Sequence, residues 1–182
     1  MTFCRGAGRG TIARRQKYKI VVTVIDGDDF DSTFTQVEAL DVLADIALEG
    51  NPEREQRVQK IKDITDEGMS GKLTLRESLE KRVQILGANK KHLSPLVDAL
   101  KKKVSKSFKR NKEFLTSHSD NIFIISNGFR DFIVPIVTDY GIKAENVFAN
   151  EFEFDEKGEI IGYDKNNALS SNNGKVEQLK QL

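Results

Sequence analysis

The sequence predicts an α/β fold: a Rossmann-like parallel sheet core with an inserted helical-bundle cap and a small β-hairpin. Three observations lead to this class. A run of mostly β-branched residues over 20–25 is followed by residues 37–105, which show helical periodicity and no strand signal. Two further apolar runs, over 121–126 and 147–149, alternate with a helical stretch, as the strands of a parallel sheet do. Turn chemistry over 155–158 separates two short apolar stretches, which indicates the hairpin.

The first predicted strand is followed by carboxylates. Residues 20–25 read Ile-Val-Val-Thr-Val-Ile, a composition typical of a strand that is buried on both faces. Asp29 and Asp31 come shortly after it, and Thr33 stands two residues further on. Open α/β sheets bind their ligands at the carboxyl ends of the strands. Two carboxylates at that edge can have different roles in a reaction: one attacks as a nucleophile, and the other gives and takes a proton.

A second pair of carboxylates, Asp26 and Asp28, overlaps with the first and directly follows the apolar run. Neither of them has a threonine at the spacing that separates Thr33 from Asp29 and Asp31. We therefore assign the chemistry to Asp29 and Asp31.

Four helices are predicted in the inserted segment, because apolar residues recur there every three or four positions. Their expected ranges are 37–50, 51–68, 71–87 and 93–108. Glycine lies at the end of each of the first three, as it commonly does at helix C-termini. The fourth is expected as one continuous apolar stripe through Leu93, Leu96, Leu100, Val104 and Phe108.

Polar residues end the second strand and begin the last helix. Ser126 ends the run 121–126, and Asn127 and Gly128 follow where the backbone is expected to turn into a helix. A hydroxyl beside free N–H groups at a helix N-terminus is suited to binding phosphate. Lys175 follows Asn-Asn-Gly at the start of the last predicted helix, where a cation opposes the helix dipole. A bound phosphate would give this lysine a role, because its charge neutralises the developing negative charge.

The pattern divides the chain into three parts. Residues 1–17 are basic, glycine-rich and aperiodic, and we expect a tail that is disordered or foreign to the natural protein. Residues 18–36 together with 106–182 form the predicted α/β core, and 37–105 form the helical cap.

Composition argues against several classes of partner. The chain of 182 residues has 29 Lys and Arg against 28 Asp and Glu, which gives no electrostatic reason to expect nucleic acid or a membrane surface. No apolar run approaches the roughly 20 residues of a membrane span. The single cysteine, Cys4, allows no internal disulfide, and we expect a cytoplasmic protein. Oligomeric state is left open.

Three short motifs in chain order resemble those of a known superfamily. The motifs DFDST, IISNGF and NGK are similar to the first three motifs of the haloacid dehalogenase-like hydrolases. Four longer stretches most resemble the phosphoserine phosphatase family: DFDSTFTQVEALDVLA, ITDEGMSGKLTLRESLEKRVQIL, ISNGF and ANEFEFDEKGEIIG. The resemblance runs from about Asp29 to Lys175, most of the chain. Each motif alone is weak, whereas the ordered set with a cap segment between is specific.

The resemblance implies a Mg²⁺-dependent phosphomonoester hydrolase that acts on phosphoserine, a small phosphorylated metabolite, in L-serine biosynthesis. Asp29 would be phosphorylated, and Asp31 would protonate the leaving oxygen and then activate water. Both would also be magnesium ligands. Phosphate would be bound by Thr33, Ser126, Asn127, Gly128 and Lys175. The substrate's serine part would be recognised by Glu38 at its ammonium, Arg82 at its carboxylate, and Met69.

The sequence departs from the family's pattern in two places. Asp26-Gly27-Asp28 stands between the apolar run and the first motif, which would shift the register of the catalytic side chains. The family's fourth motif, an acidic loop that supplies further magnesium ligands, is absent. We therefore expect a C-terminally truncated phosphatase, in which residues 1–182 alone lack magnesium-dependent activity.

Two other functions stay open at this point. One is a related phosphatase with another small phosphometabolite, and the other is a catalytically silent fragment or interaction domain. Single residues also have simpler interpretations. Asp31 could simply be a residue that forms a turn, and Glu38 could simply be an acidic residue that is favoured near a helix start. Arg82 could pair on an exposed helix face, and Met69 could fill the core.

Overall fold

The computed structural model describes residues 19–23, 34–35 and 37–182. Three strands form a parallel sheet in the order β1-β2-β3. They are β1 (Ile20–Thr23), β2 (Ile122–Phe129) and β3 (Val147–Asn150). In the register of β1 with β2, Thr23 is opposite Ile125. The predicted α/β class with a parallel sheet is therefore confirmed.

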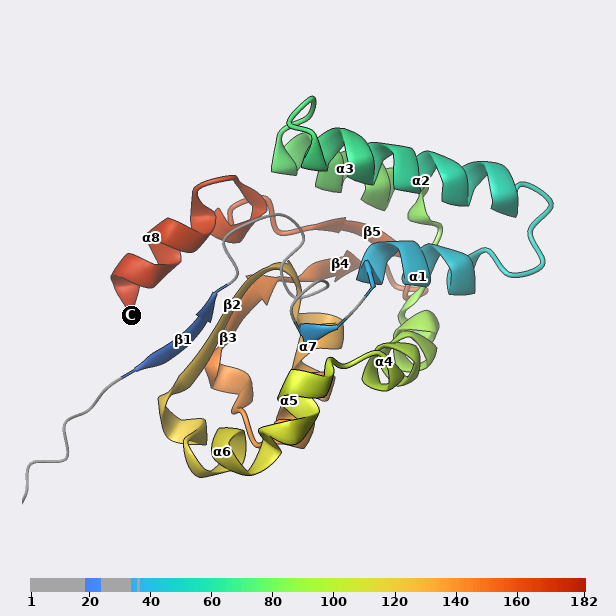
Figure 1. Ribbon diagram of the computed structural model, residues 1–182. Coiled ribbons are helices and arrows are strands. Elements are labelled where there is room, and N and C mark those ends of the chain that lie inside the picture. The colour runs from blue at the N-terminus through green and yellow to red at the C-terminus, as the bar shows by residue number, and fades with distance from the viewer. Residues whose placement is uncertain (1–18, 24–33, 36) are drawn as a thin grey trace, which may run out of the picture.

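Helices follow the chain between and after these strands (Figure 1). Among the described residues they are α1 (Ala39–Ala47), α2 (Arg54–Met69), α3 (Leu75–Leu86), α4 (Leu93–Lys102), α5 (Lys106–Arg110), α6 (Lys112–Ser117), α7 (Arg130–Val137) and α8 (Gly174–Gln181). Helix α7 packs against β2 and β3, and α4 packs against α7. The side of α7 that contacts the core is fully apolar: Phe132, Ile133, Ile136 and Val137. None of these helices is both long and apolar enough to cross a bilayer.

Helices α1, α2 and α3 pack on one another and form the outer part of the inserted segment (Figure 1). The apolar stripes predicted for them are buried, for example at Leu43, Ile61 and Leu86. Helix α3 begins with a capping box, in which Thr74 accepts a bond from the Glu77 N–H and the Glu77 carboxylate accepts one from the Thr74 N–H. The predicted helices therefore form where apolar periodicity and local capping agree.

The two ends of the inserted segment meet beside the core. Thr35 and Val104 form an isolated antiparallel bridge, and the Ser105 N–H donates to the Phe34 carbonyl at 2.8 Å. The Phe34 ring lies 4.2 Å from the Phe108 ring, measured between centroids. This closure is what an insertion between β1 and β2 requires.

The predicted single helix over 93–108 is wrong. Helix α4 ends at Lys102, and a separate helix, α5, starts at Lys106. Val104 and Phe108 belong to the apolar pattern because they contact Thr35 and Phe34, which are far away in the sequence. Periodicity alone cannot distinguish such a non-local contact from one more helical turn.

A β-hairpin follows the sheet, as predicted. Strands β4 (Phe152–Phe154) and β5 (Ile160–Tyr163) pair antiparallel, and Gly158 takes a φ of +78° in the turn between them. The Asn89 side-chain amide donates to Lys157 O at 3.0 Å and to Glu159 Oε1 at 2.9 Å. The hairpin turn is thus fastened to the segment that joins α3 to α4.

His92 should make stability depend on pH. The Asn89 N–H donates to Nδ1 of His92 at 3.0 Å, and burial together with the nearby Lys91 lowers the pKa of His92. An unfolded histidine titrates at about 6.5. Because protonation is harder in the folded state, this group's contribution is present above that pH and is lost as pH falls below it.

We therefore expect the free energy of unfolding of the wild type to fall more steeply from pH 7.5 to 5.5 than that of His92→Gln, which does not titrate. Urea unfolding at a series of pH values measures this. Parallel pH profiles for the two proteins would contradict the expectation.

Candidate active site

The second strand reaches further than predicted. Residues Ser126, Asn127 and Gly128 continue β2 to Phe129, so the expected end of the strand at Ser126 is wrong, and α7 begins directly after Phe129, at Arg130. The register with β3 shifts between Ile125 and Phe129, as at a β-bulge. Ser126 is 2% exposed, and its Oγ accepts a hydrogen bond from the Gly128 N–H at 3.0 Å. We call residues 126–128, the part of β2 where this register shift occurs, the β2 turn.

Asparagine side chains hold the β2 turn to its neighbours. The Asn127 amide donates to the Leu169 carbonyl at 2.5 Å. The Asn150 amide donates to the Asn127 carbonyl at 2.7 Å and to the same Leu169 carbonyl at 3.2 Å. These bonds join the ends of β2 and β3 to a short 3₁₀ turn, η6 (Ala168–Ser170).

Asn150 is a residue that the sequence analysis missed. Its side chain is fully buried, and within the described part of the chain its Oδ1 has no hydrogen-bond partner. The two carbonyl acceptors fix which side-chain atom is the nitrogen. The available signal was weak, an asparagine at the end of the third apolar run.

Lys175 lies in the first turn of α8, as predicted, and is half-buried. Helix α8 contacts η6 and β2. The approach is so close that a Cβ placed on Gly174 would lie 1.9 Å from the Ala168 carbonyl oxygen. The start of α8, with Lys175, is therefore set against the segment that also binds the β2 turn.

Arg82 is buried inside the cap, between helices α1, α2 and α3. Its side chain donates from Nη1 to Thr65 Oγ1 at 3.3 Å, and that hydroxyl lies 3.4 Å from Asp41 Oδ1. Since Arg82 is only 3% exposed, the simpler interpretation of an arginine on an exposed helix face is wrong. A guanidinium in such a place is costly unless anions or other acceptors surround it.

Glu38 and Met69 lie at helix ends of the cap. Glu38 directly precedes α1 and is half-buried, and its side chain makes no capping bond. Met69 is the last residue of α2 and is 62% exposed, so it does not fill the core.

Asp29, Asp31 and Thr33 lie outside the described residues, as do Asp26 and Asp28. Because β1 is parallel to β2 and Thr23 pairs with Ile125, the described part of β1 ends beside the residue that precedes Ser126. Among the described residues, no group of three or more His, Cys, Asp or Glu could hold a metal ion.

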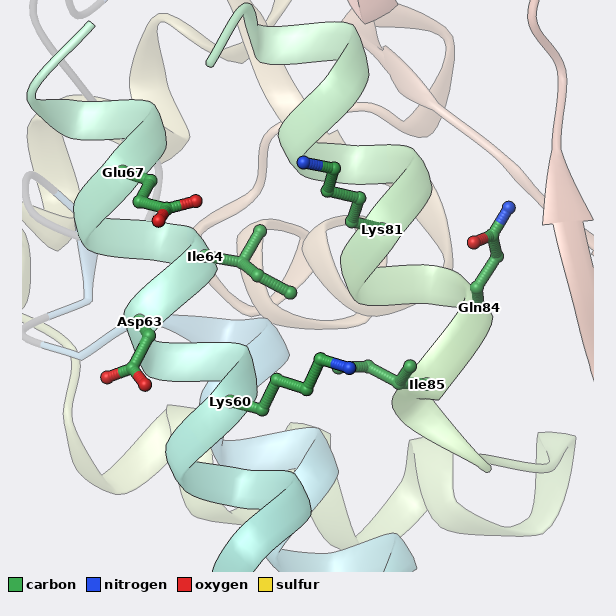
Figure 2. A pocket seen from close by; sticks show the side chains of 7 residues that line it. All are labelled: Lys60, Asp63, Ile64, Glu67, Lys81, Gln84 and Ile85. Carbon is green, nitrogen blue, oxygen red and sulfur yellow. The ribbon is translucent and has the colours of Figure 1, made fainter. Parts of the chain in front are cut away.

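A surface groove of about 450 Å³ lies elsewhere, between α2 and α3 (Figure 2). It is lined by two apolar residues, Ile64 and Ile85, and by the polar residues Lys60, Asp63, Glu67, Lys81 and Gln84. None of the predicted site residues that the structure describes lines this groove, so we do not take it as the candidate active site.

Sequence comparison finds relatives among the phosphoserine phosphatases, while no family model matches. Phosphoserine phosphatase of Drosophila melanogaster is 29% identical over 151 residues, which are 83% of this chain and 53% of that protein. The chloroplastic enzyme of Arabidopsis thaliana is 27% identical, over 85% of this chain and 50% of its own length. The human enzyme is 25% identical, over 85% and 65%. The chain thus spans between half and two thirds of these relatives.

Solved structures agree on the fold. A phosphoserine phosphohydrolase-like protein from Francisella tularensis superposes with a TM-score of 0.70 at 24% identity, covering 89% of this chain and 73% of that one. A substrate-bound phosphoserine phosphatase complex superposes with a TM-score of 0.67 at 22% identity, covering 91% and 70%. The fold is that of the haloacid dehalogenase-like hydrolases. In sequence the chain is related to the phosphoserine phosphatases, so the resemblance seen in its motifs is confirmed.

Proposed function

We propose that the protein hydrolyses a phosphomonoester, with phosphoserine as the substrate, through a phosphorylated Asp29. One observation carries the proposal: the β2 turn and the start of α8 with Lys175 are held by one bonded segment, at the sheet edge where the described part of β1 ends. The relationship to phosphoserine phosphatases supports the substrate. We propose a cytoplasmic setting in serine biosynthesis.

The reaction has two steps. A carboxylate oxygen of Asp29 attacks phosphorus, and the bond from phosphorus to the serine oxygen breaks while Asp31 gives that oxygen its proton. Asp31 then takes a proton from water, whose oxygen attacks the same phosphorus. The aspartyl–phosphorus bond breaks, which releases phosphate and restores Asp29. Ser126, the amides of Asn127 and Gly128, and Lys175 would hold the phosphate oxygens, with Thr33 supporting the loop.

Magnesium fits the donor chemistry of the proposed site, since Asp29 and Asp31 supply the carboxylate oxygens that this ion prefers. When bound, it would offset the repulsion between an anionic nucleophile and a phosphate dianion.

The cap would determine substrate specificity. A phosphoserine carries an ammonium and a carboxylate at fixed separation, so it needs one anion and one cation. Glu38 would supply the anion, and Arg82 suits a planar carboxylate. The burial of Arg82 supports this role, because a buried guanidinium makes stronger polar bonds than an exposed one.

The proposal is tested by measuring phosphate release from a panel of phosphorylated metabolites, with Mg²⁺ and with a chelator, alongside calorimetric binding of phosphoserine. In a version of the chain that includes the fourth motif, we expect chelator-sensitive release that is fastest with phosphoserine, and residues 1–182 alone should show no magnesium-dependent release. Faster release from another member of the panel would favour the related phosphatase. Binding without release from any member would favour a catalytically silent domain.

Arg82→Ala should depress activity on phosphoserine by about 10- to 150-fold, the effect of losing a charge-assisted hydrogen bond of roughly 1.5–3 kcal/mol. Activity on a generic aryl phosphate, which has no carboxylate, should hardly change. Steady-state kinetics on both substrates measures the difference.

Arg57→Ala is the matched control. The Arg57 guanidinium is half-buried on α2 and donates to the Ile85 carbonyl at 2.7 Å, so its removal perturbs the cap without touching Arg82. Equal losses on both substrates in Arg82→Ala would make that residue structural and remove the main support for phosphoserine.

A further inference from the structure

A segment between β5 and α8, residues 164–172, is bonded to the cap. We call it the linking segment. The Leu75 N–H donates to the Asn172 side-chain oxygen at 2.9 Å. The Arg76 guanidinium donates from one nitrogen, Nη2, to the Lys165 carbonyl and to Ser170 Oγ, each at 3.1 Å. Three hydrogen bonds thus run from the first turn of α3 to a segment almost a hundred residues later.

The same segment is bonded to the sheet. Ser170 is fully buried, and its hydroxyl donates to the Asn167 carbonyl at 2.8 Å. The Asn167 side chain donates to the Ala149 carbonyl, in β3, at 2.8 Å. The Leu169 carbonyl accepts the bond from Asn127 of the β2 turn. A continuous chain of hydrogen bonds therefore joins α3 to the ends of β2 and β3.

The bond to Leu75 also caps a helix. Leu75 is the first residue of α3, and its N–H has no acceptor within the helix. Because Asn172 supplies that acceptor, movement of the linking segment away from the cap would leave this N–H without its partner. The ion pair of Lys165 with Glu80 adds a further contact, but both groups are exposed and such pairs contribute little.

We propose that Arg76 is a positioning residue, which holds the cap helix α3 at a fixed place relative to the linking segment and so relative to Lys175. The inference rests on the proposed function. Arg82 lies on the same helix as Arg76, and Lys175 follows the linking segment directly. A ligand with phosphate at one end and an amino acid at the other gains from this arrangement, because its second end binds at high effective concentration once the first is bound.

The test compares two ligands on Arg76→Ala by calorimetry of the full chain. Phosphoserine should bind about 10- to 100-fold more weakly than to the wild type, because its two ends no longer meet groups held in register. Inorganic phosphate, which needs only the core, should bind within about twofold of the wild-type affinity. Arg76→Lys should recover most of the loss, since one nitrogen makes both bonds of the guanidinium.

Arg54→Ala is the control. Arg54 is an exposed arginine at the start of α2, and its guanidinium pairs with Asp45 of α1 rather than with the linking segment. This substitution should leave both affinities unchanged. Equal weakening of both ligands by Arg76→Ala would show a general structural role and overturn the inference. If the wild type binds neither ligand, the proposed function fails, and hydrogen exchange then decides whether Arg76 holds the linking segment.

Hydrogen exchange gives a readout that needs no ligand. In Arg76→Ala, the amides of Leu75 and of residues 168–171 should exchange faster than in the wild type, while those of α6 stay as they are. Unchanged exchange over 168–171 would mean that Arg76 does not hold the linking segment, and would overturn the inference whether or not phosphoserine binds.

Discussion

In a version of the chain that includes the fourth motif, replacing Asp29 by asparagine should abolish turnover of phosphoserine, by roughly 10⁴-fold or more, as removal of a covalent nucleophile commonly does. An amide has nearly the shape of a carboxylate but does not attack phosphorus, so the fold should be retained. Phosphate release measures the loss. Thermal unfolding followed by circular dichroism should show a midpoint close to that of the wild type.

Asp26→Asn is the matched control for this prediction. It changes the same group in the same segment, but Asp26 lacks the spacing to Thr33 that Asp29 and Asp31 share. It should leave turnover nearly unchanged. If Asp26→Asn is the inactive protein and Asp29→Asn the active one, the motif is shifted in register and the assigned nucleophile is wrong.

Much of the fold follows from local patterns in the sequence. Apolar runs predicted β1 and β2, because buried parallel strands have no polar face. The expected burial of the first strand on both faces is wrong, since β1 is at the edge of the described sheet and Ile20 and Val21 are half-buried. The hairpin was predicted from Asp155 to Gly158, and the structure gives the glycine a positive φ there. The predicted ends of helices and strands were wrong where contacts with distant segments determine them. The end of α4 depends on the bridge of Val104 to Thr35, and the extension of β2 past Ser126 depends on its pairing with β3.

The residues of the candidate site also fall into two groups, those that local patterns predict and those that depend on contacts with distant segments. Ser126 and Lys175 were predicted because Ser126 ends an apolar run and Lys175 lies at the start of a helix, positions that local patterns reveal. Asn150, Arg76 and Asn172 were missed, since each is a polar residue whose partner lies far along the chain. Nothing in their neighbours' sequence marks them, and only the folded arrangement shows that they join the cap to the β2 turn.

Gly174→Ala should be the most destabilising small substitution near the site. A methyl group at this position would lie 1.9 Å from the Ala168 carbonyl oxygen, 2.4 Å from its carbon and 2.7 Å from the Leu169 nitrogen. All three are backbone atoms, so no side chain can rotate to make room, and α8 or η6 must move. We expect a loss of about 3 kcal/mol in the free energy of unfolding, the upper range for overpacking. Differential scanning calorimetry should show this as a fall in Tm of roughly 6–12 °C.

Gly162→Ala separates this steric effect from the general cost of adding a methyl group. There the nearest atom to the new Cβ is Glu153 Oε2 at 2.9 Å, the far end of a flexible side chain that can turn away, so Tm should stay within a few degrees of the wild type. The displacement in Gly174→Ala also carries Lys175 with it, because the two residues are neighbours in the first turn of α8. Phosphate affinity should therefore fall in Gly174→Ala even at temperatures where the protein is fully folded, and remain normal in Gly162→Ala. A Gly174→Ala protein with wild-type Tm and wild-type phosphate affinity would mean that α8 can shift freely and that Lys175 does not hold phosphate.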